Sequence, residues 1–214
     1  MTVSQTINGG LRRVPVWLLY LLAVAPPVWL FWQAVTGGLG VDPVRGLELA
    51  IGKRGLQLLV VSLAITPLRK FTGISLIRFR RAISLIGFSY IFLHLLVWLV
   101  LDVQIPSQIW ADILKRPYIT IGMTAFALMI PLAVTSNNWS LRKLGPVRWR
   151  RLHKLTYPVL ILGGVHYTLI SKVWQPEALA YLAGILVLLI SRINLARCCS
   201  WVWHKLSPST NGAA

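Results

Sequence analysis

The sequence predicts an all-α membrane protein with six transmembrane helices in one bundle. Of its 214 residues, 56% are hydrophobic and only 13% are charged, which is too apolar for an ordinary soluble domain. The apolar residues gather in six segments long enough to cross a bilayer. The lysines and arginines lie in short blocks between these segments, as topology signals do.

The predicted spans follow one another along the chain with short connections. The first contains Pro26 and Pro27, which predict a kink in that helix. The second begins with Lys53 and Arg54, so its apolar core is Gly55 to Pro67 and we expect a short or tilted helix. The six spans are residues 14–35, 49–67, 82–101, 117–135, 155–171 and 178–195.

The charged residues predict the orientation of the chain. Sixteen of the 22 lysines and arginines lie in the N-terminus, the second and fourth connections and the C-terminus, where there is no acid. Because positive loops stay in the cytoplasm, both termini are predicted to be cytoplasmic. The opposite side holds the other six basic residues and all five acids, which are Asp42, Glu48, Asp102, Asp112 and Glu177.

The same charge pattern narrows the function. Since no acid lies within an apolar core, the sequence disfavours a carboxylate-driven pump. A net charge of +17 that lies in blocks between spans indicates topology and contact with membrane lipid, and we expect no nucleic acid partner. There is no glycine-rich phosphate loop, so a dinucleotide-binding domain is not expected.

Two histidines on different predicted helices lie at similar depth. His94 follows Arg81 by 13 residues, roughly 20 Å along a helix, and His166 follows Arg151 by 15 residues, roughly 22 Å. Both predicted helices run outward, so both imidazoles lie in the outer half of the membrane. This arrangement favours axial ligation of one haem iron between two helices. Gly87 and Gly163 precede these histidines and would leave room for a flat macrocycle.

The other two histidines are less informative. His153 lies roughly 20 Å from His166 toward the cytoplasmic side, where it fits either a ligand or an interfacial side chain. Arg81 and Ile83, its depth-matched neighbours on the third span, do not ligate iron, so a second bis-histidine haem is incomplete. A ligand from elsewhere, a shared arrangement or a different cofactor would be needed. His204 is predicted to be a solvated residue of the tail.

Four sequence runs resemble the MsrQ family, which is similar to the wider ferric-reductase-like transmembrane group. The resemblance covers roughly residues 11 to 195. The runs are TPLRKFTG, RRAISLIGFSYIFLHLLVWLVLD, KRPYITIGMTAFALMIPLAVTSN and LRKLGPVRWRRLHKLTYPVLILGGVHY. The resemblance implies a cytoplasmic N-terminus over 1–13, a ferric-reductase-like transmembrane domain over 14–195 and a cytoplasmic tail over 196–214.

The resemblance also implies cofactors and partners. Members of this family bind b-type haem, with FMN as a further cofactor, and their haem histidines fall on His94, His153 and His166 here. They pass electrons from a cytoplasmic flavin reductase or the quinone pool to a periplasmic molybdopterin reductase of the MsrP type. That partner reduces methionine sulfoxide in oxidised proteins.

We therefore expect a cytochrome of the bacterial inner membrane that moves electrons outward, with one or two haem b groups. In this prediction His94 and His166 ligate the outer haem, while His153 serves a second haem or lies near a flavin. The chain itself is expected to transform no substrate. The alternatives are a stand-alone transmembrane reductase of ferric iron or oxygen, and a non-redox membrane protein whose histidines pack or relay protons.

Overall fold

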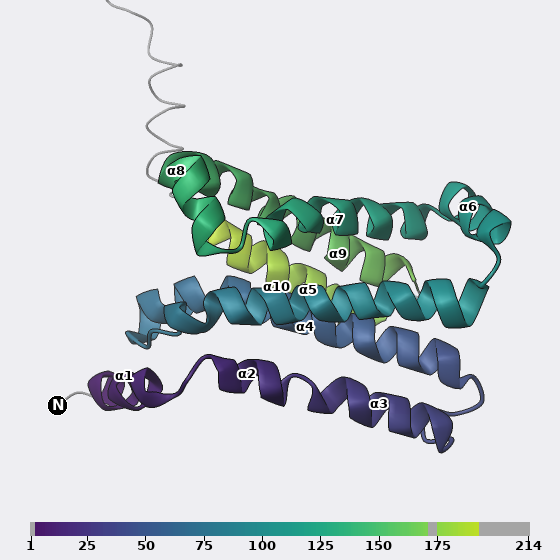
Figure 1. Ribbon diagram of the computed structural model, residues 1–214, viewed down its shortest axis with the longest axis horizontal. Helices are drawn as coiled ribbons and strands as arrows, with labels where there is room; N and C mark the ends of the chain where they lie inside the picture. Colours follow the sequence, from purple (N-terminus) through teal and green to yellow (C-terminus); the bar gives the residue numbers. More distant parts are fainter. Residues whose placement is uncertain (1–2, 171–174, 193–214) are drawn as a thin grey trace, which may run out of the picture.

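The computed structural model describes residues 3–170 and 175–192, and every regular element in these ranges is a helix, which confirms the all-α class (Figure 1). The predicted positions that fall at 171 and 193–214, including His204, lie outside the described residues. The α-helices are α1 (Val3–Arg13), α2 (Trp17–Leu22), α3 (Ala25–Val35), α4 (Pro43–Thr72), α5 (Arg80–Val97), α6 (Pro106–Lys115), α7 (Pro117–Val134), α8 (Asn138–Leu152), α9 (Thr156–Leu169) and α10 (Pro176–Ile190). Two 3₁₀ turns, η1 (Ile77–Phe79) and η3 (His153–Leu155), precede α5 and α9, and a π-helical segment, η2 (Trp98–Val103), follows α5.

The long helices run side by side along the longest axis of the molecule (Figure 1). The pair α4 and α5 forms the centre, with α2 and α3 on one side and α7, α9 and α10 on the other. We call the two ends of the bundle the α6 end and the α8 end, after the short helix found at each. Helix α1 also lies at the α8 end.

Four helical stretches are long and apolar enough to cross a membrane, which supports a multi-pass membrane protein. The fifth and sixth predicted spans correspond to α9 and α10, with 14 and 15 residues. Both are shorter than the roughly 20 residues that a perpendicular span needs. The four stretches are Trp17–Val35, Pro43–Thr72, Ile77–Val103 and Pro117–Val134.

The predicted kink in the first span is present. Helix α2 ends at Leu22 and α3 begins at Ala25, with Pro26 and Pro27 in the first turn of α3. A proline is tolerated there because the first turn of a helix has no intrahelical acceptors for its N–H groups. The prolines therefore divide the span into two helices.

Of the two alternatives predicted for the second helix, short or tilted, the short one is wrong, because α4 has 30 residues. Its start is capped by Asp42, whose carboxylate accepts from the Arg45 N–H at 3.0 Å. Its polar side chains find partners on α10: Lys53 pairs with Glu177 at 2.5 Å, and Gln57 donates to the Tyr181 hydroxyl at 2.6 Å. Because Lys53 and Gln57 have these partners, α4 continues through a polar stretch at which the sequence suggested that the span begins.

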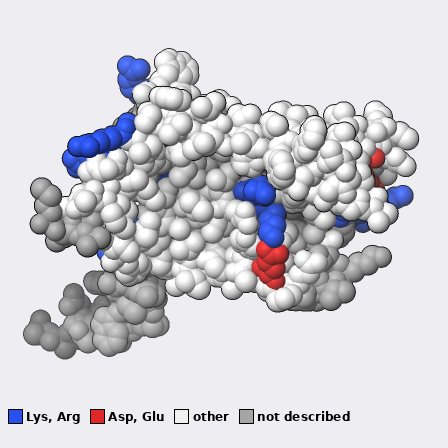
Figure 2. Space-filling model, turned by 90° about the horizontal axis from the view of Figure 1, so that it is seen from below, with Lys and Arg blue, Asp and Glu red and all other residues white. Residues whose placement is uncertain are grey.

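The charge pattern follows the long axis. Figure 2 shows Lys and Arg toward the end that holds α1 and α8, a second group of them beside acidic residues nearer the other end, and mostly uncharged surface between these groups. The apolar middle is the surface expected of a protein embedded in a bilayer.

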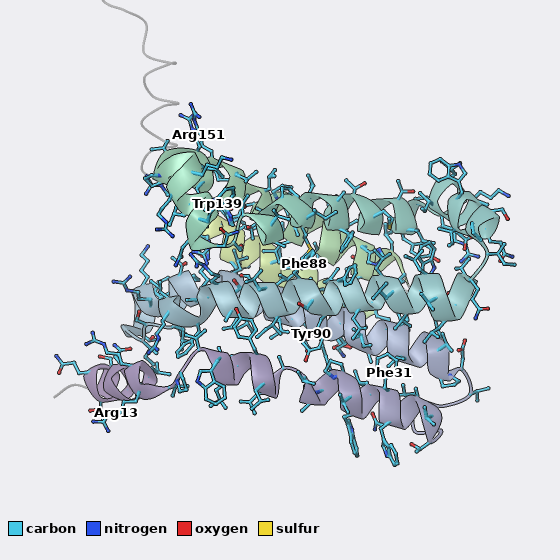
Figure 3. The ribbon with its side chains drawn as sticks, in the orientation of Figure 1. Arg13, Phe31, Phe88, Tyr90, Trp139 and Arg151 are labelled. Atoms are coloured by element: carbon cyan, nitrogen blue, oxygen red, sulfur yellow. The ribbon has the colours of Figure 1, made fainter. Side chains whose placement is uncertain are left out.

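Tyr90 joins α5 to the first span, since its hydroxyl donates to the Ala23 carbonyl at 2.7 Å (Figure 3).

Candidate functional site

The structure brings together the two histidines that the depth match predicts. His94 on α5 and His166 on α9 line one cavity, with their ring centroids 6.3 Å apart and their planes inclined at 76°. We call this space the paired-histidine cavity. Helices α4, α5, α7 and α9 form most of its wall.

Each of these imidazoles is held by a backbone carbonyl. The Nδ1 atom of His94 lies 2.8 Å from the Glu48 carbonyl oxygen on α4, and Nδ1 of His166 lies 2.7 Å from that of Tyr118 on α7. A carbonyl oxygen only accepts, so each Nδ1 carries the proton. Among the described residues neither Nε2 has a hydrogen-bond partner, so each Nε2 offers a lone pair that could coordinate a metal.

The pair suits a metal that takes most of its ligands from a macrocycle. Metal–imidazole bonds are about 2 Å long, so two of them in line separate the two Nε2 atoms by about 4 Å. The distance from each Nε2 to the centroid of its ring adds to this, which brings the expected centroid separation close to the observed 6.3 Å. A metal held by protein alone usually has three or four side-chain ligands. No cluster of three His, Cys, Asp or Glu residues exists in the described ranges. Haem, which needs only axial ligands, fits these residues.

The structure corrects the position of one acid. Glu48 was expected in an outer connection, but it lies within α4, its side chain is 5% exposed, and it lines the paired-histidine cavity. Arg45 offsets the cost of burying this carboxylate by donating to it at 3.0 Å. The sequence signal was the i, i+3 spacing of Arg45 and Glu48, which lets the two side chains meet on one helix face.

The two glycines predicted to make room for a macrocycle have different surroundings. Gly163 lines the paired-histidine cavity, as predicted. The prediction for Gly87 is wrong, because it packs on α4, where an added Cβ would lie 3.0 Å from Leu59 and 3.4 Å from Leu58. Gly87 therefore allows α5 to pack closely against α4.

His153 lies in a separate environment at the α8 end. Its ring stacks on Trp149 with centroids 3.8 Å apart, and its Nε2 is 3.1 Å from the Thr135 hydroxyl. That hydroxyl donates to the Pro131 carbonyl at 2.6 Å, so His153 Nε2–H donates to the hydroxyl and Nδ1 is the unprotonated nitrogen. Burial, and then the positive charges of Arg80 and Arg81, lowers the pKa of His153, which keeps the ring neutral near pH 7.

Basic and aromatic side chains surround His153. We call this region the His153 cavity, and no acid is among the described residues that line it. Leu59, Met129 and Val159 line both this region and the paired-histidine cavity, so single apolar side chains separate the two. The basic residues that line the His153 cavity are Lys70, Arg80, Arg81, Arg150, Lys154 and Arg192.

An aromatic stack lies beside this partition. Phe88 on α5 faces α7 (Figure 3), and its ring centroid is 5.8 Å from that of Phe126, with the planes 7° apart. Phe88 lines the His153 cavity and Phe126 lines the paired-histidine cavity. The stack therefore reaches from one cavity to the other.

The long apolar helices, with two imidazoles facing one internal cavity, define a multi-pass membrane protein with a candidate metal site inside its bundle. The family described as ferric reductase like transmembrane component matches residues 51–164. Proteins of Brucella ovis, Brucella suis and Brucella melitensis, each named protein-methionine-sulfoxide reductase heme-binding subunit MsrQ, are 46% identical over 178 residues, which covers 83% of this chain and 80% of theirs. The chain belongs to the MsrQ family of ferric-reductase-like membrane proteins. No solved structure matches it.

Proposed function

We propose that this protein is a membrane cytochrome b subunit that carries electrons across the bacterial inner membrane to a periplasmic molybdopterin reductase of the MsrP type. That partner would reduce methionine sulfoxide in oxidised proteins. The observation that carries the proposal is the His94–His166 pair, whose rings are 6.3 Å apart and held by their Nδ1 atoms. The Brucella relatives are named as heme-binding subunits, which supports it.

In this proposal His94 and His166 would hold the iron of haem b. When bound, haem supplies a one-electron ferric/ferrous couple. The two Nδ1–H groups keep each imidazole in the tautomer that offers Nε2 to iron. Arg45 and Arg116 also line the cavity and would pair with the carboxylates of the porphyrin.

His153 would act at the side where electrons enter. Its basic surroundings suit an anionic cofactor or donor, so the His153 cavity is our proposed site for FMN or for a second haem. The donor would be a cytoplasmic flavin reductase or the quinone pool. The thin partition of Leu59, Met129 and Val159 would keep the path between the two cavities short.

The orientation belongs to the same proposal. Six spans with both termini in the cytoplasm would put the α8 end at the cytoplasmic face and the α6 end at the periplasmic face. The concentration of lysine and arginine at the α8 end supports this orientation. The paired-histidine cavity would then lie nearer the periplasmic partner.

The test is a reduced-minus-oxidised absorption spectrum of the purified protein, with haem and flavin quantified. We expect a low-spin b-type spectrum that is lost in His94→Ala and His166→Ala and kept in His204→Ala. His153→Ala would report a second site if it removes part of the haem or the flavin. A colourless wild-type protein from haem-sufficient cells would contradict the proposal and favour a non-redox membrane protein.

A second candidate is a stand-alone reductase of ferric iron or oxygen. It is favoured by the match of residues 51–164 to the family described as ferric reductase like transmembrane component. His94 and His166 would bind the haem in this case too. Rapid reoxidation of the reduced protein by ferric chelates or oxygen, with no partner present, would support this function over transfer to a periplasmic reductase.

A further inference from the structure

The carbonyls that hold the paired imidazoles share one local arrangement. His94 bonds to the carbonyl of Glu48, and Gly52 lies four residues further along α4. His166 bonds to the carbonyl of Tyr118, and Gly122 lies four residues further along α7. The same spacing therefore occurs on two helices that are not consecutive in the chain.

This spacing has a steric reason. In an α-helix the carbonyl of residue i points toward the N–H of residue i+4, so a second donor must approach it past the side chain at i+4. A Cβ added at Gly52 would lie 2.8 Å from His94 Nδ1 and 3.1 Å from its Cε1. At Gly122 it would lie 2.8 Å from both Nδ1 and Cε1 of His166. The 2.8 Å separations are shorter than real Cβ contacts, so any larger residue would displace the ring.

We infer that Gly52 and Gly122 are positioning residues that set the orientation and donor strength of the two histidine ligands. The inference rests on the proposed haem site and concerns how that site is tuned. An imidazole whose Nδ1–H is bonded to a carbonyl is a stronger donor through Nε2, which stabilises ferric iron. Displacing the ring breaks that bond, weakens the donor and raises the midpoint potential.

A third glycine separates this role from simple helix packing. Gly55 lies one turn beyond Gly52 on α4, and a Cβ there would meet Ile91 Cδ1 at 2.6 Å and Cγ1 at 2.9 Å. The clash is as severe as at Gly52, but it falls on an apolar side chain of α5. Gly55→Ala is therefore a matched control for crowding between α4 and α5 without contact with an imidazole.

The experiment compares haem content, midpoint potential and electron paramagnetic resonance g values in four alanine variants of the full chain. Gly52→Ala and Gly122→Ala should each raise the potential, shift the g values and weaken haem binding by about 10–100-fold. Gly55→Ala should keep the wild-type potential and g values in whatever fraction folds. Gly184→Ala, whose added Cβ meets nothing within 4 Å, should match wild type throughout.

The wild-type spectrum gives a second test that needs no variant. Imidazole planes held 76° apart leave the two iron d orbitals of π symmetry nearly equal in energy, which gives a highly anisotropic low-spin signal. A signal typical of parallel planes, or unchanged potentials and g values in Gly52→Ala and Gly122→Ala, would overturn the inference while leaving the haem site intact. A wild-type protein without haem would instead contradict the proposed function.

Discussion

Glu48 provides a negative charge beside the paired imidazoles, and this charge should affect the potential of the site. Glu48→Gln removes the carboxylate and leaves Arg45 without its partner 3.0 Å away. Both changes disfavour ferric iron, so we expect the midpoint potential to rise. At an effective dielectric constant of about 20, one unit charge roughly 10 Å from the iron contributes about 2 kcal/mol. Redox titration of the bound haem measures the shift.

Arg45 supplies the opposite control. Arg45→Gln removes the positive charge and should lower the potential, while the double variant should lie close to wild type because both charges are gone. A fall in potential on Glu48→Gln would show that the carboxylate does not act through its charge.

At the scale of single residues, the sequence was sufficient to find the histidines but not what holds them. Counting residues from the basic blocks predicted that His94 and His166 share a depth. The bonds to Glu48 and Tyr118 depend on how α4 and α7 are rotated about their axes, which residue counting does not give. Gly163 was recognised because it precedes His166 on the same helix. Gly52 and Gly122 lie on the neighbouring helices α4 and α7, so they were missed.

At the scale of helices, α10 is joined to α4 by polar contacts that bear on stability. Lys53→Met leaves Glu177 without its 2.5 Å partner, and Glu177→Gln does the same to Lys53. We expect each single variant to lower the thermal midpoint in detergent more than the double variant does, since a lone charge is costlier than none. Because the two side chains are 36% and 48% exposed, the loss should stay near the about 1 kcal/mol of an exposed pair.

The matching control lies one turn along α4. Gln57→Leu breaks a neutral hydrogen bond to Tyr181, so its effect should be smaller than that of either single charge variant. If the double variant at Lys53 and Glu177 is the least stable of the set, the pair is a source of net stability instead.

Helix boundaries were predicted where a strong local signal exists. Pro26 and Pro27 correctly predicted the break between α2 and α3. The length of α4 was underestimated because Lys53 and Arg54 resemble a span boundary, and Glu177, the partner of Lys53, lies more than a hundred residues away in the sequence. Helix α6 was also missed, since its amphipathic pattern is too short to stand out within a connection.

For the whole molecule, the proposed orientation can be tested by labelling cysteines from one side of the membrane. After Cys198 and Cys199 are replaced by serine, Gln108→Cys on α6 and Arg142→Cys on α8 each present one exposed thiol. We expect a membrane-impermeant maleimide to label Gln108→Cys in spheroplasts and to label Arg142→Cys only after lysis. Labelling in the reverse pattern would invert the orientation, and equal labelling of both would contradict an odd number of spans between them.

The separation of the two histidine cavities also decides how the protein responds to voltage. His153 and His166 lie 13 residues apart, roughly 20 Å along a helical path, out of a hydrocarbon thickness of about 30 Å. In the proposed orientation an electron that passes between them leaves the negative side of the membrane. It gains up to about 2.3 kcal/mol for each 100 mV it crosses. Each turnover would therefore discharge the membrane slightly, and protein repair would run faster in an energised cell than in a depolarised one.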